Sequence, residues 1–413
     1  MSADKSEIVV PKSLVHSCLV TAIAGLLAAC AGEVIDSVPD TAAGSAQPHL
    51  SAGPGGSIVL SWLEPADAGV ALRFSTFDGR TWSPADTAAA GDSWFVNWAD
   101  IPSVAPIDDT TWAAHWLVRK PVGVYTYDVY AAISNDSGET WGEPFVLHND
   151  NTDSEHGFVT LFPWDNDIGA LWLDGRNTVS SGGHDAHAGG MTLRSARLSE
   201  SGEFAQRVEV DGLICDCCST DVAVTSNGPV AVYRDRTPNE IRDIAVTRLV
   251  DGKWLPGAPI ANDDWEIAGC PVNGPAIDAH DDLVSVAWFT APNDEPAVRI
   301  AVSADGGTTF SPALDIDRDA PLGRVDVIQL ADGSSIVSWL ASGDNQTAAI
   351  VARRVDLNGH LGDIVSIVET GAGRTSGFPQ MMSSGDNLLF AWTDVSGDET
   401  RVQTRLVPIS ELR

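Results

Sequence analysis

The sequence predicts an all-β fold, a single β-propeller of four-stranded antiparallel blades, because one pattern recurs along the whole chain. Seven short apolar runs each end in an aromatic residue, at steps of 54, 56, 61, 55, 51 and 53 residues. These aromatic residues are Trp62, Trp116, Trp172, Tyr233, Trp288, Trp339 and Trp392. A period near fifty residues made of short strands is typical of propellers. The pattern predicts seven blades, and six blades with one irregular repeat is the alternative.

Each repeat contains further runs that predict the strands of one blade. In the fifth repeat the runs are Pro275–Asp278, Leu283–Trp288, Val298–Ser303 and Phe310–Ile316. They are short, rich in Val, Ile and Ala, and bounded by turn residues, and no segment shows sustained helical periodicity. The blades are expected at residues 45–90, 97–148, 156–212, 217–262, 270–318, 322–368 and 376–410. The last repeat is short, so a strand borrowed from near the N-terminal tether is one way to close the ring.

A second motif recurs at one phase of the repeat. Ser134–Trp141 reads Ser-x-Asp-x-Gly-x-Thr-Trp, Ser303–Phe310 is a copy with Phe in place of Trp, and Phe77–Trp82 is a shortened third. In a tight hairpin the Asp accepts backbone N–H bonds, the Gly supplies a positive φ, and the aromatic ring packs on the blade. These motifs resemble the Asp-box, or BNR, repeats of the sialidase-like propellers. In that family the box lies on the face opposite the site, so we interpret its Asp residues as structural.

The N-terminus predicts export. Lys5, Lys12 and His16 precede the apolar stretch Leu19–Ala29, which is typical of a signal peptide over residues 1–29. The stretch ends in Leu-Ala-Ala-Cys30, which resembles a bacterial lipobox and implies cleavage before Cys30 and lipid attachment to its sulfur. An ordinary secretory cleavage site is the alternative. We expect a flexible tether at 30–44, a propeller at 45–413, and a membrane-anchored lipoprotein facing the periplasm or cell exterior.

The chain is strongly acidic, with 24 Lys and Arg residues against 57 Asp and Glu residues and a formal net charge of −33. Such a surface repels phosphate backbones, so we expect no nucleic-acid partner. It also disfavours unassisted binding to anionic lipid, so we expect contact with a membrane only through the lipid anchor.

Propeller topology predicts where the unusual polar residues meet. Each inner strand begins on the face where the second strand ends, so the loops at these two positions share one face. The loops that lead into inner strands carry Asn97, Asp100, Glu155, His156, Cys215, Cys217, Cys218, Asp221, Cys270, Asn273, Arg324 and Arg374. The loops after second strands carry Arg176, Arg234, Asp235, Arg236, Glu240 and Arg242. We predict one polar pocket, in which the substrate-binding candidates are Asn97, Arg176, Asp221, Arg234 and Asn273.

The resemblance to sialidase-like enzymes implies roles for some of these residues. Those enzymes hold an anionic sugar with three arginines and use an Asp acid/base with a Tyr–Glu nucleophile pair. Arg236, Arg324 and Arg374 are the candidates for an arginine cluster. Asp100 or Glu155 is the candidate proton donor, if burial raises its pKa. The chain departs from the family because its tyrosines, at positions 125, 127, 130 and 233, leave the last two blades without one.

Four cysteines fall on two neighbouring loops. Cys215, Cys217 and Cys218 open the fourth blade and Cys270 opens the fifth, while His156 opens the third. Four sulfurs and an imidazole suit a soft ion such as copper(I) or zinc, and nearby arginines would lower the thiol pKa values. One or two disulfides, for example Cys270 with Cys217 or Cys218, are the alternative in an oxidising compartment. Free or redox-active thiols are the third possibility.

These observations predict an exported lipoprotein propeller with a carbohydrate or small anionic ligand. It looks like uncharacterised bacterial members of the superfamily that bear a Cys-x-Cys-Cys loop, and not like a standard sialidase. Glycan- or anion-directed binding, with glycoside hydrolysis as a possible activity, is the leading hypothesis. A metal-binding or metal-dependent propeller that uses copper or zinc, and a non-catalytic scaffold that binds a protein, are the alternatives.

Overall fold

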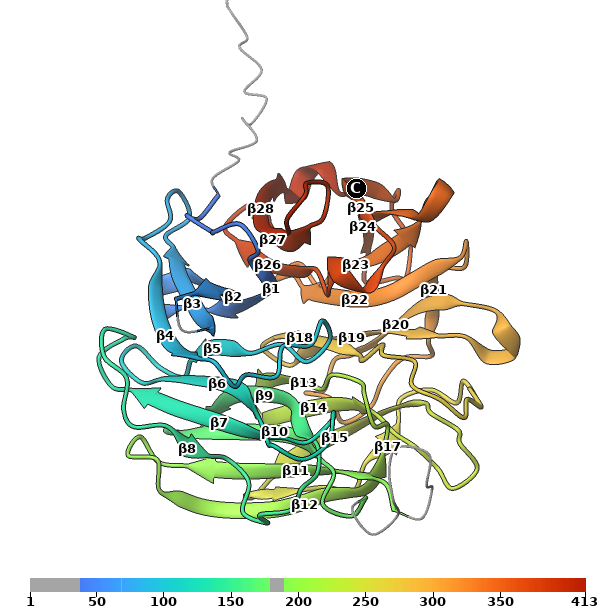
Figure 1. The fold of residues 1–413 in the computed structure, drawn as a ribbon. Coiled ribbons are helices and arrows are strands. Elements are labelled where there is room, and N and C mark those ends of the chain that lie inside the picture. The colour runs from blue at the N-terminus through green and yellow to red at the C-terminus, as the bar shows by residue number, and fades with distance from the viewer. Residues whose placement is uncertain (1–37, 68, 179–188) are drawn as a thin grey trace, which may run out of the picture. The chain divides into compact units, whose positions relative to one another are not determined.

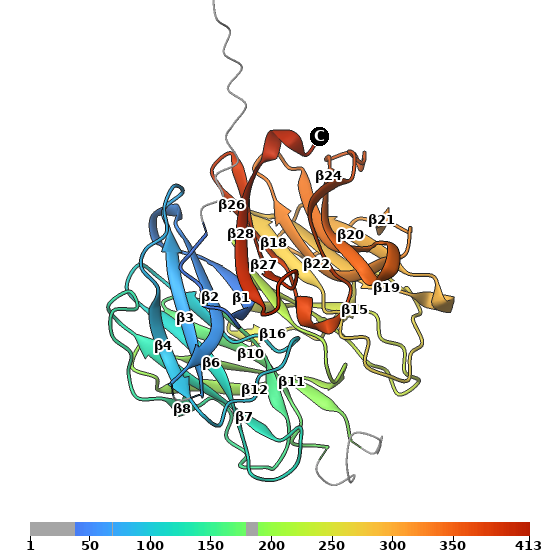
Figure 2. The same ribbon diagram turned by 45° about the horizontal axis from the view of Figure 1, so that its top comes forward.

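The structure, a computed structural model, describes residues 38–67, 69–178 and 189–413. In these residues the chain forms seven antiparallel sheets, each built from strands that are consecutive in the sequence (Figure 1). Each inner strand contacts the neighbouring sheet, and the last inner strand, β26 (Gln380–Ser384), contacts the first, β1 (Ala46–Ala52). The sheets therefore close into a ring (Figure 2). This confirms the seven-bladed propeller, and the six-bladed alternative was wrong.

The strands follow the chain from the inside of each blade to its outside. The first blade contains β1 (Ala46–Ala52), β2 (Ile58–Ala66), β3 (Gly69–Phe77) and β4 (Asp86–Gly91). The second contains β5 (Ser103–Pro106), β6 (Trp112–Arg119), β7 (Tyr127–Ser134) and β8 (Phe145–Val146). The third contains β9 (His156–Trp164), β10 (Asp167–Asp174), β11 (Met191–Leu198) and β12 (Phe204–Ile214). The fourth contains β13 (Asp221–Thr225), β14 (Gly228–Arg234), β15 (Ile244–Val250), β16 (Lys253–Trp254) and β17 (Ala258–Pro259). The fifth contains β18 (Ala276–His280), β19 (Leu283–Thr290), β20 (Ala297–Ser303) and β21 (Leu314–Asp317). The sixth contains β22 (Pro321–Gln329), β23 (Ser335–Ser342), β24 (Thr347–Val355) and β25 (Val365–Gly371). The seventh contains β26 (Gln380–Ser384), β27 (Asn387–Asp394) and β28 (Arg401–Pro408). Short 3-10 turns lie at Pro54–Gly56, Pro292–Asp294, Asp344–Gln346, Arg374–Ser376 and Ile409–Glu411.

The predicted signal peptide at 1–29 and the predicted lipidation site Cys30 lie outside the described residues. In the part of the chain that the structure describes, no helix has the length and apolar character needed to cross a membrane.

The repeated aromatic residues are buried where one blade packs on the previous one. Four of the tryptophans are at most 1% exposed, and each indole N–H donates to a carboxylate. The pairs are Trp62 with Glu64, Trp172 with Asp174, Trp288 with Asp263 and Trp339 with Asp317. A large ring fills the space between two sheets, and its one polar group keeps a hydrogen-bond partner. This physical requirement is the origin of the pattern in the sequence.

The last blade has three strands, and an N-terminal segment adds hydrogen bonds along its outer strand. The Gly44 N–H donates to Thr400 O at 2.8 Å, and the Val402 N–H donates to Ser45 Oγ at 2.9 Å. The Thr41 hydroxyl donates to Val402 O at 3.0 Å. The segment is not a regular strand, but it ties the start of the ring to its end.

The hairpins after the third strands of the second and fifth blades are held by an Asp. Asp136 Oδ1 accepts the Thr140 N–H, and Asp305 Oδ1 accepts the Thr309 N–H, each at 2.8 Å. Gly138, with φ of 87°, makes the turn that a side chain would strain. These hairpins lie at the C-terminal ends of β7 and β20, opposite the face where the inner strands begin.

Aspartates on the inner strands join neighbouring blades around a central channel. The Oδ2 atoms of Asp221, Asp278 and Asp326 accept the backbone N–H groups of Ile277, Gln329 and Met381, respectively, on the next blade. Burial raises the pKa values of Asp221 and Asp278 to about 6. Two cavities of about 490 and 110 Å³ occupy the channel, and both are lined by Asp221. Asp221, a predicted substrate-binding residue, thus links the fourth and fifth blades.

Candidate functional site

The loops that lead into the inner strands meet on one face of the ring, which we call the site face. The Arg324 N–H donates to Asn273 Oδ1 at 2.8 Å, which connects the loop of Cys270 to the sixth blade. The guanidinium carbons of Arg324 and Arg374 lie 5.0 and 5.8 Å from the Trp98 ring centroid. The second, fifth, sixth and seventh blades therefore contribute to the same surface, as the topology predicts.

A buried phenol on this face lies between two carboxyl groups, which we call the acid–phenol cluster of Asp100, Tyr127 and Glu155. Tyr127 Oη lies 3.0 Å from Asp100 Oδ2 and 2.7 Å from Glu155 Oε1. A phenol carries one proton and can donate it to only one carboxylate. The second contact is a hydrogen bond only if the other carboxyl is protonated.

The surroundings of the acid–phenol cluster favour the protonated form of its carboxyl groups. Burial raises the pKa of Asp100 to about 7. Burial and the nearby charges of Asp100 and Asp216 raise the pKa of Glu155 to about 8, against the opposing effect of the Tyr127 hydrogen bond. The Asp100 and Tyr127 side chains are fully buried, whereas Glu155 is partly exposed. Glu155 is therefore the member that can reach a ligand.

Close backbone packing fixes the acid–phenol cluster. The Phe158 N–H donates to Asp100 Oδ1 at 2.7 Å, and Phe158 has a φ of 52°, which is rare for a bulky residue. A Cβ at Gly157 would lie 1.9 Å from Asp100 Oδ2. Phe95 stacks on the Tyr127 ring with centroids 4.1 Å apart. The strained residue and the necessary glycine sit next to a pair of acids, as is common at functional sites.

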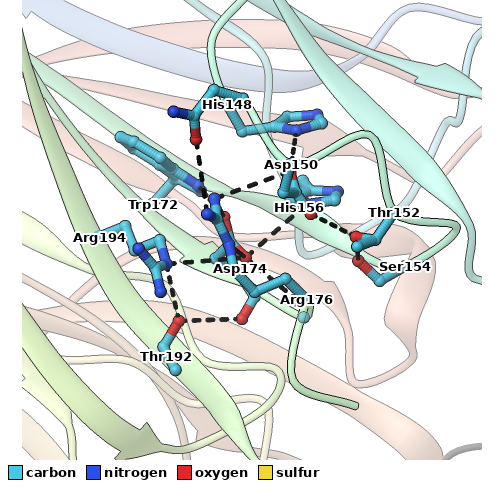
Figure 3. Close-up of polar contacts among 12 residues, drawn as sticks. His148, Asp150, Thr152, Ser154, His156, Trp172, Asp174, Arg176, Thr192 and Arg194 are labelled. Atoms are coloured by element: carbon cyan, nitrogen blue, oxygen red, sulfur yellow. Dashed lines mark hydrogen bonds and ion pairs between the residues drawn. The ribbon is translucent and has the colours of Figure 1, made fainter. Parts of the chain in front are cut away.

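His156, next to Glu155 in the chain, belongs to a second, largely buried group, the histidine cluster of Asp128, His148, Asp150, His156 and Asp174. Figure 3 shows its members other than Asp128. The two imidazole rings are parallel, with centroids 3.6 Å apart. His148 contacts Asp150 through Nδ1 at 2.6 Å and Asp128 through Nε2 at 3.1 Å. His156 Nε2 lies 3.1 Å from Asp150 and 3.8 Å from Asp174. Both rings thus have carboxylates as partners.

Arg176 completes the charge balance of the histidine cluster. Its Nε and Nη2 atoms each donate to Asp174 at 2.7 Å, and the Trp172 indole donates to the same carboxylate at 2.9 Å. Burial opposes the charged form of His148, but its bonds to Asp128 and Asp150 outweigh this and raise its pKa. Two sets of three ligand atoms, Asp128–His148–His156 and Asp150–His156–Asp174, are close enough to hold a metal ion. Most of their polar atoms have partners within the group, but His148 Nε2 and Asp128 Oδ1, which lie 3.1 Å apart, do not form a well-oriented hydrogen bond.

A third group on the site face is the cysteine cluster of Cys215, Cys217, Cys218 and Cys270. It lies near Glu155, because Asp216 in the same segment acts on Glu155 through its charge. The sulfurs of the first three lie within 4.8 Å of one another, and the Cys215 and Cys218 sulfurs are 2.9 Å apart. Cys217 also accepts or donates a hydrogen bond with Cys270. All four thiols are free. The structure brings the four predicted sulfurs together and places His156 in the histidine cluster instead.

Positive charge lies next to these sulfurs. Arg242 Nη1 donates to Cys215 Sγ at 3.5 Å, and the Cys215 N–H donates to Arg234 O at 3.0 Å. Burial alone would raise the pKa of Cys215, but hydrogen bonds from Cys217 and Cys218 and the charge of Arg242 bring it well below its usual value. Cys215 is thus the thiol of the cluster whose surroundings most favour loss of its proton.

The three arginines predicted to form a clamp have different partners. Arg236 pairs with Asp216 at 3.1 Å and with Glu240 at 2.6 Å. The buried Arg324 guanidinium donates to Ser376 Oγ, Gly377 O and Gly373 O at 2.7, 2.9 and 3.0 Å, and burial lowers its pKa to about 10. Arg374 is exposed beside Trp98. Arg374 is therefore the member best placed to meet a ligand.

The remaining predicted residues serve mainly to shape loops. Asn97 Oδ1 accepts the Ala99 N–H at 3.0 Å. Arg234 is 1% exposed and donates to the backbone oxygens of Asn273, Arg242 and Phe289. These contacts hold the loops of the fourth and fifth blades in position.

Sequence reasoning missed Tyr127, Trp98 and Asp216. Tyr127 begins β7, and a third strand begins on the face where the second strand ends, so the start of each third strand also belongs to the site face. Trp98 stacks on Phe378 with centroids 5.6 Å apart and is adjacent to the predicted loop residue Asn97. The predicted strand order therefore could have placed both Tyr127 and Trp98 on the site face.

Comparison with known proteins supports the fold. No protein-family model matches the sequence, and no curated protein matches it. A protein of unknown function from Dyadobacter fermentans aligns at 15% identity and a TM-score of 0.51, covering 91% of this chain and 98% of that one. The phage phi92 endosialidase aligns at 8% identity and a TM-score of 0.51, covering 90% and 68%. An α-L-arabinanase from Penicillium chrysogenum, complexed with arabinobiose, aligns at 13% identity and a TM-score of 0.49, covering 92% and 98%. The chain is a seven-bladed β-propeller, and its fold is similar to those of the Dyadobacter protein and the phage phi92 endosialidase.

Proposed function

We propose that this protein is an exported propeller that binds a carbohydrate on its site face and hydrolyses it, with Glu155 as the proton donor. The observation that carries this proposal is the acid–phenol cluster, in which Tyr127 contacts two carboxyl groups at 3.0 and 2.7 Å. This arrangement keeps a proton on a carboxyl near neutral pH, which is what a general acid needs.

Glycoside hydrolysis also needs a carboxylate that stays ionised. Asp100 is fully buried, so we assign it the role of holding the proton on Glu155. Asp216 is 22% exposed, pairs with Arg236 at 3.1 Å, and acts on Glu155 through its charge. In this mechanism Glu155 gives its proton to the leaving oxygen as the glycosidic bond breaks. Asp216 takes a proton from the water that adds to the anomeric carbon.

Aromatic and cationic groups at the mouth of the channel support a sugar ligand. The Trp98 and Phe378 rings stack with an interplanar angle of 18°, and both lie against arginines. A flat aromatic surface suits the apolar face of a sugar ring, and the exposed Arg374 suits an anionic substituent.

An array of neutral and anionic oligosaccharides, followed by hydrolysis assays on those that bind, tests this function. We expect Glu155→Gln to lower kcat by about 10²–10⁴-fold with binding retained, because the proton donor is lost. Trp98→Ala should weaken binding. Glu139→Gln is the control, because Glu139 is exposed in the hairpin on the opposite face. Binding to no glycan in the array, or full turnover by Glu155→Gln, would contradict the proposal.

The pH profile is a second test. Glu155 must carry its proton to act, and its pKa is raised to about 8. Turnover should therefore fall as the pH rises through about 8. A profile that instead stays flat up to pH 9 would exclude Glu155 as the acid.

The lipid anchor is part of the proposal. The apolar stretch Leu19–Ala29 before Cys30 supports it. Cells that produce the protein should incorporate an alkyne-labelled fatty acid into it, and Cys30→Ala should abolish labelling. Equal labelling of both proteins would rule out Cys30 as the lipidated residue.

A further inference from the structure

We propose that the cysteine cluster is a binding site for one thiophilic metal ion, for which we expect copper(I), with Cys215, Cys217 and Cys218 as ligands. This inference goes beyond the proposed carbohydrate function and does not depend on it. It uses different side chains from those assigned to the acid chemistry.

The sulfur geometry is the first support. Three sulfurs from the four-residue segment Cys215–Cys218 lie within 4.8 Å of one another, so one ion between them can contact all three after small adjustments. Cys270 contacts Cys217 and is exposed, which leaves it at the solvent side of the group. Soft thiolate ligands select copper(I) or zinc over hard cations. Cys270 contacts Cys217 but is not one of the sulfurs that all lie within 4.8 Å of one another, so the compact group has three sulfurs. Three thiolates favour copper(I), because zinc prefers four ligands.

Buried positive charge is the second, independent support. Arg234 is 1% exposed, and its guanidinium donates to three backbone carbonyls. Backbone carbonyls carry no net charge, so these contacts do not neutralise the guanidinium. A buried charge is costly unless an opposite charge lies near it. The backbone N–H of Cys215 donates to the backbone oxygen of Arg234. The Cys215 sulfur lies 3.5 Å from a second guanidinium group, that of Arg242. Arg242 already pairs with Glu240 at 2.9 Å and with Asp216 at 3.6 Å, so the charge left to balance is that of Arg234, which acts on Cys215. Anionic thiolates around an ion complement this cation, whereas a neutral disulfide would not.

The chemistry of binding is simple. Each thiol that becomes a ligand releases one proton, and the sulfur lone pair forms the bond to the ion. No electron transfer is needed if the metal arrives as copper(I). The residue between the first two ligands is Asp216, so the bound ion would also fix the loop that holds this carboxylate.

Copper(I) titration in competition with bathocuproine disulfonate, on the full reduced chain under anaerobic conditions, tests the site. All proteins carry Cys18→Ser and Cys30→Ser, so that only the four clustered thiols remain. We expect one copper(I) per chain by native mass spectrometry, and a displaced, weaker binding curve with Cys217→Ser. Cys217 is only partly buried, so this variant should fold, which thermal unfolding checks. His280→Ala is the control because it removes an exposed imidazole at the far end of β18, and it should bind copper(I) as the parent does.

Three results would overturn the proposal. The first is unchanged copper(I) binding by folded Cys217→Ser. The second is a reduced chain that binds zinc(II) but not copper(I), which would refute the metal assignment. The third is a protein that, purified without reductant from its exported location, contains quantitative disulfides and takes up no copper(I) after reduction. Neither failure nor success here changes the hydrolysis assay of Glu155→Gln, so the two proposals fail separately.

Discussion

The histidine cluster and the cysteine cluster both gather metal-ligand side chains, but they differ in how their polar atoms are satisfied. In the histidine cluster each imidazole meets carboxylates, and Asp174 accepts two bonds from Arg176 at 2.7 Å. In the cysteine cluster the sulfurs mainly meet other sulfurs beside buried guanidinium groups. The histidine cluster thus provides carboxylate partners for both imidazoles and for Arg176 without an ion, and only the contact between His148 Nε2 and Asp128 Oδ1 is poorly oriented. A group of soft ligands beside cations is better completed by an ion.

The comparison predicts, first, that the histidine cluster supports the fold regardless of metal. Asp174→Asn should lower the free energy of unfolding by about 3–5 kcal/mol, because it removes the buried carboxylate that accepts two bonds from Arg176. Urea unfolding with and without copper(I) measures this. Asp165→Asn, with a side chain that is 74% exposed, is the control and should change stability by less than about 0.5 kcal/mol. A loss that appears only when copper(I) is present would show that the histidine cluster, and not the cysteine cluster, holds the ion.

The cysteine cluster, by contrast, should stabilise the fold only through a bound ion. Free copper(I) at a hundred times its dissociation constant should raise the free energy of unfolding by at most about 2.7 kcal/mol, because any binding to the same cysteines in the unfolded chain reduces the gain. Cys217→Ser should remove this gain. Denaturant titrations at fixed copper(I) activity provide the measurement, and an equal gain in the variant would place the ion elsewhere.

The two clusters should also differ in pH dependence. The pKa of His148 is raised by Asp128 and Asp150, so its stabilising effect is full below its unfolded pKa near 6.5 and is lost as the pH rises through its folded pKa. In metal-free protein, His148→Gln should flatten that decline, while Cys217→Ser should leave it unchanged between pH 6 and 8. Unfolding curves across this range decide the matter. An unaltered slope in His148→Gln would show that this imidazole is not the titrating group.

The smallest effect is expected at the edge of the cysteine cluster. Cys270 is exposed, so Cys270→Ser should change the metal-free stability by less than about 0.5 kcal/mol. It should weaken copper(I) binding less than Cys217→Ser does. A larger loss for Cys270→Ser in the competition titration would move Cys270 into the ligand set and revise the three-sulfur assignment.

The sequence was sufficient to predict the fold because its cause is local and repeated. A large aromatic residue fills each gap between blades, so it recurs at the blade period, as with Trp172 and Trp288. The same phasing also placed Cys270 beside Cys217, since adjacent blades must have adjacent loops. These are statements about strand order, which a linear pattern can carry.

The partners of individual side chains could not be predicted in the same way. Glu155 and His156 are consecutive, and successive residues near the start of a strand point to opposite sides. Glu155 meets Tyr127, while His156 meets Asp150 and so is separated from the cysteines. The loop position of Arg324 predicted that its guanidinium would bind a ligand. In the structure its N–H groups instead donate to protein oxygens such as Gly377 O. Which donor meets which acceptor depends on distances that spacing in the sequence does not determine.

X-ray absorption spectroscopy at the copper edge of the copper(I)-loaded protein tests the contrast between the clusters most directly. We expect the atoms bonded to copper to be sulfur alone, in three-fold coordination, and we expect Cys217→Ser to remove a sulfur from this set. Nitrogen or oxygen atoms bonded to the copper would instead identify the histidine cluster as the metal site and rule out the three-cysteine site.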